Sequence, residues 1–94
     1  AIRQVRADLY FMGVCSVHPE AGLSTGDFEE AAVKRALSAA AAETIVLASP
    51  EKLATASPYQ VIPLDELSGL VTTASVPEDV LAPYRKRGIS IHLA

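Results

Sequence analysis

Residues 7–14, ADLYFMGV, decide the fold because they form a short, almost continuously apolar run that ends beside a glycine. Such a run is typical of a strand that is buried on both faces, as in a parallel sheet. Residues 44–48, TIVLA, are also short, apolar and rich in β-branched side chains. The two runs together predict two buried strands of one sheet.

A helix is predicted between these two strands. It begins near Asp27, because an aspartate followed three residues later by Glu30 forms a capping-box pattern. Glu30 and Lys34 stand in the favourable i,i+4 order on the polar side of this helix. The apolar stripe that we expect to face the core consists of Val33, Ala36, Leu37 and Ala40.

A second helix is predicted near the end of the chain. Ser75, followed by Glu78, forms another capping box, and Gly88 marks the helix end after the basic residues 85–87. Pro83 lies inside this helix and lacks an N–H group, so we expect a kink or a break there.

The remaining segments are short. Residues 15–26 and 49–58 are rich in proline, glycine and small polar residues, and we expect both to be loops. Further short strands are expected at residues 59–62, 69–73 and 89–93, and a helical turn at residues 64–68. This alternation of strands and helices predicts an α/β domain with a mainly parallel sheet and helices on its faces.

The composition argues against several classes of protein. Of the 94 residues, 50% are apolar and the formal net charge is −3, which does not suit a disordered chain or a free-standing nucleic-acid-binding domain. The most apolar segment, residues 36–48, is interrupted by Glu43 and is shorter than the ~20 residues that span a bilayer. The single Cys15 cannot form an internal disulfide and suits a reducing compartment.

A ligand is expected at the carboxyl edge of the predicted sheet, where ligands of open parallel sheets bind. This edge comprises residues 13–25, 49–52 and 72–75. Two of these segments lead into helix N-termini, which favour anions, and Lys52 is the cation of the set. The combination predicts a small anionic ligand, such as a phosphorylated metabolite.

Cys15 and His18 suggest two other kinds of chemistry. In the first, Cys15 would be a nucleophile and His18 its base, with Glu20 as the orienting carboxylate. In the second, Cys15 and His18 would supply two ligands to a metal ion. No oxyanion motif supports the first reading, and no second pair of ligands supports the second. We therefore expect no catalytic residue, no metal and no cofactor.

Five segments carry a family resemblance: ADLYFMGV (7–14), GLSTGDFEEAAVKRAL (22–37), ETIVLASPEKLATAS (43–57), LDELSGLVTT (64–73) and RKRGISIHL (85–93). Their order and spacing resemble the second half of the sugar-phosphate sensor domain of DeoR-family transcriptional regulators. Lys52 matches the lysine of that family's pattern, whereas Thr73 stands where the family usually has an aspartate.

The resemblance implies a Rossmann-like fold similar to ribose-5-phosphate isomerase and glucosamine-6-phosphate deaminase. Residues 1–94 would form one α/β domain that is a fragment of a longer effector-binding domain. The implied effector is a phosphorylated sugar. DNA would be bound only through a helix-turn-helix domain that is not in this chain. We further expect a cytoplasmic homo-oligomer that does not bind membranes.

The implied effector-binding residues are Gly13, Ser16, His18 and Lys52. Gly13 would let the backbone approach the ligand, Ser16 and His18 would bond hydroxyl groups, and Lys52 would meet the phosphate. Two alternatives stay open. One is a sugar-phosphate isomerase or deaminase-like enzyme, which needs an acidic general base at the same edge, and the other is an oligomerisation module without a ligand.

Overall fold

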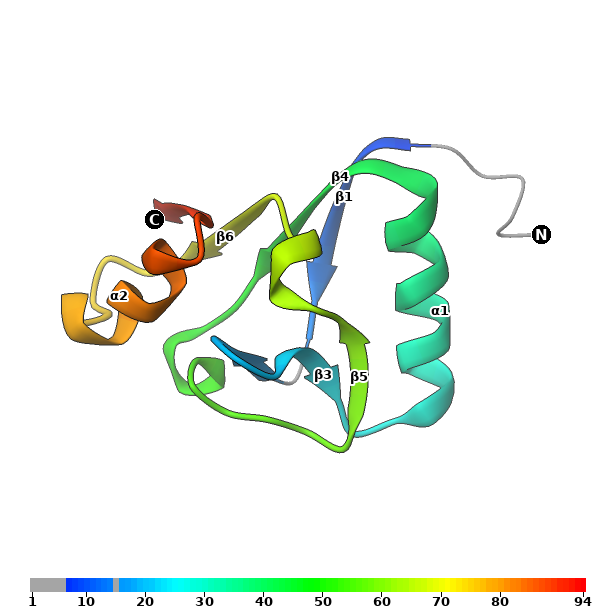
Figure 1. The fold of residues 1–94 in the computed structure, drawn as a ribbon, viewed down its shortest axis with the longest axis horizontal. Coiled ribbons are helices and arrows are strands. Elements are labelled where there is room, and N and C mark those ends of the chain that lie inside the picture. Colours follow the sequence, from blue (N-terminus) through cyan, green and yellow to red (C-terminus); the bar gives the residue numbers. More distant parts are fainter. Residues whose placement is uncertain (1–6, 15) are drawn as a thin grey trace.

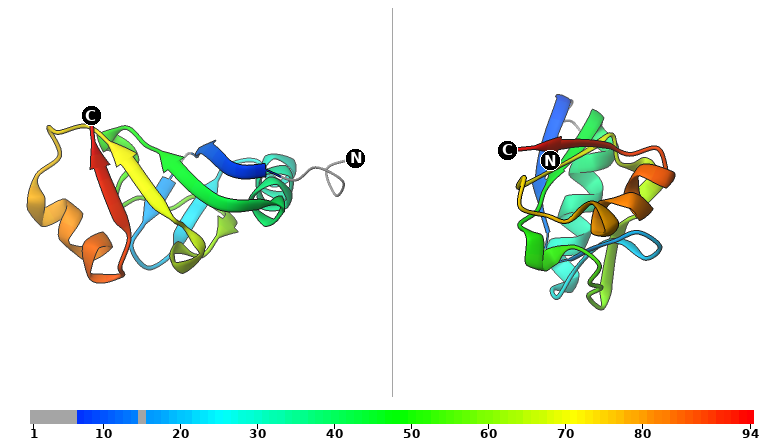
Figure 2. Two further views of the ribbon diagram at one scale, coloured as in Figure 1. Left: turned by 90° about the horizontal axis from the view of Figure 1, so that it is seen from above. Right: turned by 90° about the vertical axis from the view of Figure 1, so that its left-hand side faces the viewer.

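Two β-sheets of different size organise the structure. The computed structural model describes residues 7–14 and 16–94. Four parallel strands have the order β1-β4-β6-β7, and three short antiparallel strands have the order β2-β3-β5 (Figures 1 and 2). The large sheet contains β1 (Ala7–Gly13), β4 (Ala41–Leu47), β6 (Gly69–Thr72) and β7 (Ser90–Leu93), and the small sheet contains β2 (Ser16–His18), β3 (Gly22–Thr25) and β5 (Tyr59–Ile62).

Four helical segments connect these strands. They are α1 (Phe28–Ala40), the 3-10 turns η2 (Pro50–Lys52) and η3 (Leu64–Glu66), and α2 (Glu78–Lys86). The two α-helices lie at opposite ends of an elongated molecule whose extents are 41 × 27 × 20 Å (Figure 1). The predicted α/β class with a mainly parallel sheet is confirmed, and the described residues form one hydrophobic core.

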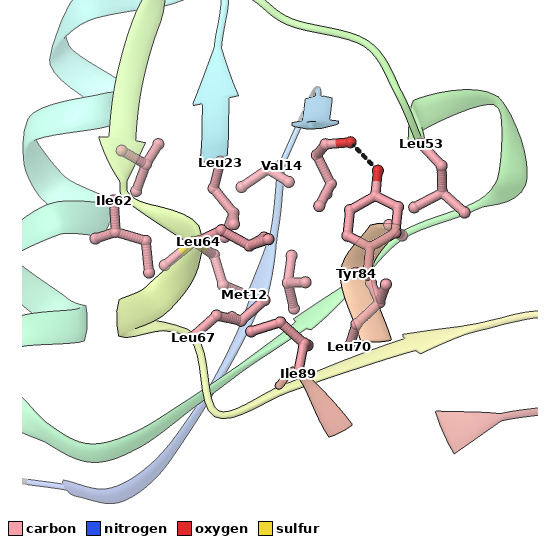
Figure 3. Close-up of a cluster of buried hydrophobic side chains, with 14 of the residues drawn as sticks. Met12, Val14, Leu23, Leu53, Ile62, Leu64, Leu67, Leu70, Tyr84 and Ile89 are labelled. Carbon is pink, nitrogen blue, oxygen red and sulfur yellow. Dashed lines mark hydrogen bonds between the residues drawn. The ribbon is translucent and has the colours of Figure 1, made fainter. Parts of the chain in front are cut away.

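That core lies on one face of the parallel sheet. Met12, Val46 and Leu70 are neighbours in register on β1, β4 and β6, and their exposed fractions are 1%, 0% and 0%. Side chains from the small sheet, η3 and α2 pack against this row (Figure 3). The row crosses three adjacent strands, so the covering elements pack against the sheet along it.

The opposite face of the sheet is open within the described residues. Successive side chains of a strand point to opposite faces, so the neighbours of Met12 and Val46 point away from the core. Phe11 is 55% exposed, Leu47 45% and Leu9 40%. The expectation that β1 is buried on both faces is therefore wrong for the part of the chain described, because both helices and the small sheet share one face.

The first helix begins as predicted, but its buried side only partly coincides with the predicted stripe. Asp27 Oδ1 accepts a 2.9 Å hydrogen bond from the Glu30 N–H, which confirms the cap. The predicted apolar stripe is confirmed only in part: Ala36, Leu37 and Ala40 are half-buried, whereas Val33 is exposed and Ala31 is the fully buried residue of α1. Ser38 on the same side bonds Thr44 of β4, with 2.8 Å between their hydroxyl oxygens. A periodicity search based on apolar residues finds only part of an inward face that includes a hydroxyl group.

The second helix begins two residues later than a cap at Ser75 predicts. Pro77 is its N-cap, and Ser75 Oγ bonds Thr73 Oγ1 at 2.7 Å instead of capping the helix. A proline disfavours helical geometry at the residue before it, which excludes Val76 from the helix. The helix continues through Pro83 without a break.

The predicted end of α2 at Gly88 is confirmed. Gly88 has a φ of +79°, and its N–H donates to the Arg85 carbonyl. The Ile89 N–H donates to the backbone carbonyl of Tyr84. This pair of bonds is a Schellman motif, which places glycine in the left-handed conformation.

The small sheet is the largest departure from the sequence prediction. Residues 15–26 were expected to form a loop, but Ser16–His18 and Gly22–Thr25 pair as antiparallel strands. Val17 and Leu23 of these strands are fully buried. Strands of three and four residues with one large apolar side chain each are too short to show a clear alternation, so turn-forming residues dominate the pattern.

Gly22 provides a sharp test of this small sheet. Its φ is +79°, and an added Cβ would lie 2.6 Å from the Ile62 carbonyl oxygen, a backbone atom that cannot move aside cheaply. We expect Gly22→Ala to reduce the free energy of unfolding by more than the ~1–2 kcal/mol that left-handed geometry alone costs. Gly26→Ala is the matched control, because a Cβ at Gly26 meets no atom within 4 Å. Urea unfolding followed by circular dichroism measures both, and equal midpoints would contradict the described backbone.

The one-sided core gives a second prediction. Met12→Ala should lower the free energy of unfolding by about 2–5 kcal/mol, the usual range for deleting a buried large side chain. Phe11→Ala should cost about 1 kcal/mol or less, because Phe11 is more than half exposed. Losses of similar size in urea titrations would show that the open face is covered in solution.

Candidate functional site

The carboxyl edge of the parallel sheet brings three chain segments together. Gly13 ends β1, Leu47 ends β4 and Thr72 ends β6, and Gly13 is paired with Leu47. Such edges are where ligands bind in open parallel sheets. The structure therefore confirms that residues after β1, β4 and β6 share one edge, as the strand order predicted.

Gly13 presents an open stretch of backbone at this edge. It is exposed, and a Cβ added to it would meet no atom within 4 Å. Its carbonyl oxygen accepts a hydrogen bond from Lys34 Nζ. Lys34 also pairs with Glu30 at 2.7 Å, which confirms the predicted i,i+4 pair. Sequence reasoning missed the reach of Lys34 to the edge, because helix periodicity places residues on a face but does not say which strand end they meet.

Lys52 lies at the end of η2, five residues after β4. Its side chain is half-buried, and its carbonyl oxygen accepts a 2.8 Å hydrogen bond from Thr55 Oγ1. Within the same turn, Ser49 Oγ donates to Glu51 Oε1 at 2.6 Å. This hydrogen bond lowers the pKa of Glu51, and the neighbouring Lys52 charge lowers it further. The turn therefore carries the Glu51 carboxylate, which Ser49 holds by a hydrogen bond, next to the Lys52 ammonium.

Ser16 lies in β2 of the small sheet, and its hydroxyl group already has a hydrogen-bond partner. The residue is 4% exposed, and its Oγ lies 2.7 Å from Ser57 Oγ. The Ser57 N–H in turn donates to Ser24 Oγ at 2.8 Å. These bonds tie β2 and β3 to the segment that leads into β5.

His18 closes the turn between β2 and β3. Its Nδ1 accepts hydrogen bonds from the N–H groups of Glu20 at 3.0 Å and Ala21 at 3.1 Å. A nitrogen that accepts carries no proton, so the neutral ring holds its proton on Nε2. Only Nε2 is then left to meet a ligand. His18 pairs with Gly22, which lies against Ile62 and Pro63 rather than beside Gly13.

The end of β6 contributes hydroxyl groups. Thr73 and Ser75 bond one another, as described above, in the segment before α2. Thr72 is 3% exposed, and its Oγ1 has no hydrogen-bond partner among the described residues. These residues add polarity to the edge without a charge.

The other predicted chemistries depend on Cys15, which lies outside the described residues. The structure therefore does not address its pairing with His18. Within residues 7–14 and 16–94, no three histidine, cysteine, aspartate or glutamate side chains gather where a metal ion fits. The same residues contain no helix that is long and apolar enough to cross a membrane.

A sequence profile of the DeoR C-terminal sensor domain matches residues 1–74. The chain belongs to this family. The family predicted from the five sequence segments is thereby confirmed, and the match includes β1, β4, β6 and the turn that carries Lys52.

The sensor domain is also similar to a curated protein of Escherichia coli O157:H7 named "Putative aga operon transcriptional repressor". The two are 26% identical over 93 residues, which is 99% of this chain and 35% of the relative. The chain thus spans about a third of the length of the curated relative it matches.

The contact between Lys34 and Gly13 gives a third prediction. Lys34→Met keeps the aliphatic stem but removes both the hydrogen bond to the Gly13 carbonyl and the ion pair with Glu30. We expect the free energy of unfolding to fall by ~1 kcal/mol, the net value of a typical hydrogen bond.

Glu30→Gln separates the two contacts, because it removes the carboxylate charge and leaves the Gly13 bond in place. It should cost less than Lys34→Met, since partly exposed ion pairs contribute ~0.2–1 kcal/mol. If urea titrations show that Glu30→Gln lowers the free energy of unfolding as much as Lys34→Met does, the bond between Lys34 and the Gly13 carbonyl contributes nothing to stability.

Proposed function

We propose that this sensor domain binds a phosphorylated sugar at the carboxyl edge of its parallel sheet, as the effector-binding part of a transcriptional regulator. The observation that carries the proposal is the position of Lys52 and Gly13. Gly13 ends β1, and Lys52 lies five residues after the end of the adjacent strand β4, so open backbone and a cation come from segments at the carboxyl ends of two paired strands. Membership of a sensor family supports a ligand over a purely structural edge.

Each proposed contact has a physical basis at its residue. The Lys52 ammonium attracts a phosphate dianion and forms charge-assisted hydrogen bonds with it. Lys34 adds little net charge because Glu30 neutralises it. For the sugar, His18 offers Nε2–H as a donor, and Ser16 has to exchange its bond to Ser57 for one to the ligand.

The proposed mechanism is a shift between two states of the whole protein. A ligand that one arrangement holds better moves the population toward that arrangement. The attached DNA-binding domain would be a helix-turn-helix outside this chain, and the protein would be a cytoplasmic homo-oligomer. The name of the E. coli relative, a transcriptional repressor, supports this assignment.

The alternative of an isomerase or deaminase-like enzyme rests on the expected similarity of fold. It needs a carboxylate placed as a general base at the same edge. Glu20 is the carboxylate of the first segment, and it is exposed in the turn that His18 closes. No other contact of Glu20 favours catalysis, so binding without turnover is the better proposal.

Isothermal titration calorimetry with phosphorylated and unphosphorylated sugars tests the proposal. We expect saturable binding of phosphorylated sugars alone, and a loss of tenfold or more in affinity for Lys52→Gln, roughly the value of a charge-assisted bond. Lys86→Gln is the matched control, because it removes the same charge from an exposed position at the end of α2. Glu51→Gln should strengthen binding, because it removes a carboxylate beside Lys52.

Three results would contradict the proposal. Equal losses for Lys52→Gln and Lys86→Gln would show unspecific charge attraction. Conversion of the sugar phosphate during the titration would show an enzyme. Association that depends on protein concentration, without any response to sugars, would show an oligomerisation module.

A further inference from the structure

Tyr84 stands out because its hydroxyl joins three segments that are distant in the sequence. It lies on α2, is fully buried, and is the largest buried side chain of the described chain. Its hydroxyl donates to the Val17 carbonyl of β2 at 2.6 Å and accepts from the Ala54 N–H at 2.9 Å. Figure 3 shows the Tyr84 ring in the core, with a dashed line from its hydroxyl. Burial raises the pKa of Tyr84, so the phenol keeps its proton at neutral pH.

The hydrogen bond from the Ala54 N–H to the Tyr84 hydroxyl lies two residues after Lys52, at the end of the turn that carries this lysine. The turn is internally closed, because the Lys52 N–H donates to Ser49 and the Leu53 N–H donates to Pro50. It is joined to the small sheet one residue later, where Leu53 bridges to Val17 and the Ala54 N–H also reaches the Val17 carbonyl at 2.9 Å. The phenol thus completes the attachment point of this turn.

The backbone at that point is unfavourable on its own. Ala54 has a φ of 59°, a left-handed conformation that costs an alanine roughly 1–2 kcal/mol. Such a conformation persists only where the surroundings hold it in place. The Tyr84 hydroxyl and the Val17 carbonyl are the two groups that hold the Ala54 amide, so they also set the position of Lys52 two residues earlier.

Packing alone does not account for a tyrosine here. A phenylalanine fills the same volume, and the Ala54 N–H and Val17 carbonyl would still bond each other without the phenol. The hydroxyl therefore adds positional restraint to the loop rather than satisfying an otherwise unpaired group.

We propose that Tyr84 is a positioning residue for the effector site, which holds the turn of Lys52 against β2 so that the ammonium is preorganised for phosphate. The inference rests on the proposed function, because it assigns Tyr84 an effect on the affinity that Lys52 provides. Preorganisation of a binding group improves affinity by lowering the ordering cost of binding.

Tyr84→Phe in the 94-residue chain tests this, with Tyr59→Phe as the matched control on an exposed ring. Without any ligand, we expect Tyr84→Phe to keep the fold and to speed amide hydrogen exchange at Ala54 by about tenfold, while Tyr59→Phe leaves it unchanged. Unchanged exchange at Ala54 in Tyr84→Phe would overturn the inference.

Ligand affinity then separates positioning from general stability. Using the phosphorylated sugar that binds the wild-type chain most tightly, we expect Tyr84→Phe to weaken binding roughly fivefold, the effect of one net hydrogen bond. In a Lys52→Gln background the same change should have no further effect, because the positioned group is absent. A fivefold loss that persists in this background would overturn the inference.

Failure of the proposed function gives a different result. If the wild-type chain binds no phosphorylated sugar, the proposed function fails and the effector role of Tyr84 is overturned with it. Faster exchange at Ala54 in Tyr84→Phe would in that case still identify the phenol as the restraint on the loop.

Discussion

The buried row Met12–Val46–Leu70 is the interaction on which the rest of the structure depends. It crosses β1, β4 and β6 in register, and each of its side chains is almost completely removed from water. Side chains of the small sheet, η3 and α2 all belong to the buried cluster that contains this row. Since the row aligns the three strands, it also aligns their carboxyl ends, where Gly13 and the turn of Lys52 are presented. The position of the proposed effector site thus follows from the core.

The open face of the sheet sets the context of this core. Parallel sheets are normally covered on both faces, yet Phe11 and Leu47 are exposed here. At the carboxyl edge, the Tyr84 hydroxyl bonds the Ala54 N–H, and Lys34 bonds the Gly13 carbonyl. These contacts connect Gly13 to α1 and the loop after Lys52 to α2.

Sequence reasoning succeeded where one local signal agreed with tertiary packing. The apolar run of β1, the Asp27 cap and the Gly88 helix end each have a local physical cause, and each is found as expected. The small sheet was missed because its strands are short and depend on pairing with distant Tyr59–Ile62. The inward face of α1 was predicted only in part, because it includes Ser38, which meets a strand hydroxyl instead of apolar side chains.

The candidate site shows the same division. Strand order and the family resemblance were enough to place Gly13 and Lys52 at one edge. They did not show that the Ser16 hydroxyl and His18 Nδ1 already have partners, because these bonds come from segments that the sequence indicated as loops. Tyr84 gave no functional signal at all, since an aromatic residue at helical spacing is usually core. Only the fold shows that its hydroxyl reaches Val17, 67 residues away.

The measurement that tests the central claim most directly is a map of amide chemical-shift changes in the chain on adding a phosphorylated sugar. A sugar phosphate bound at the proposed site should produce saturable changes confined to the ends of β1 and β4 and to β2, at residues 13–14, 16–18 and 48–54. The same sugar without its phosphate should produce none. Changes centred on the open face around Phe11 and Leu47, with the edge silent, would contradict the proposed site.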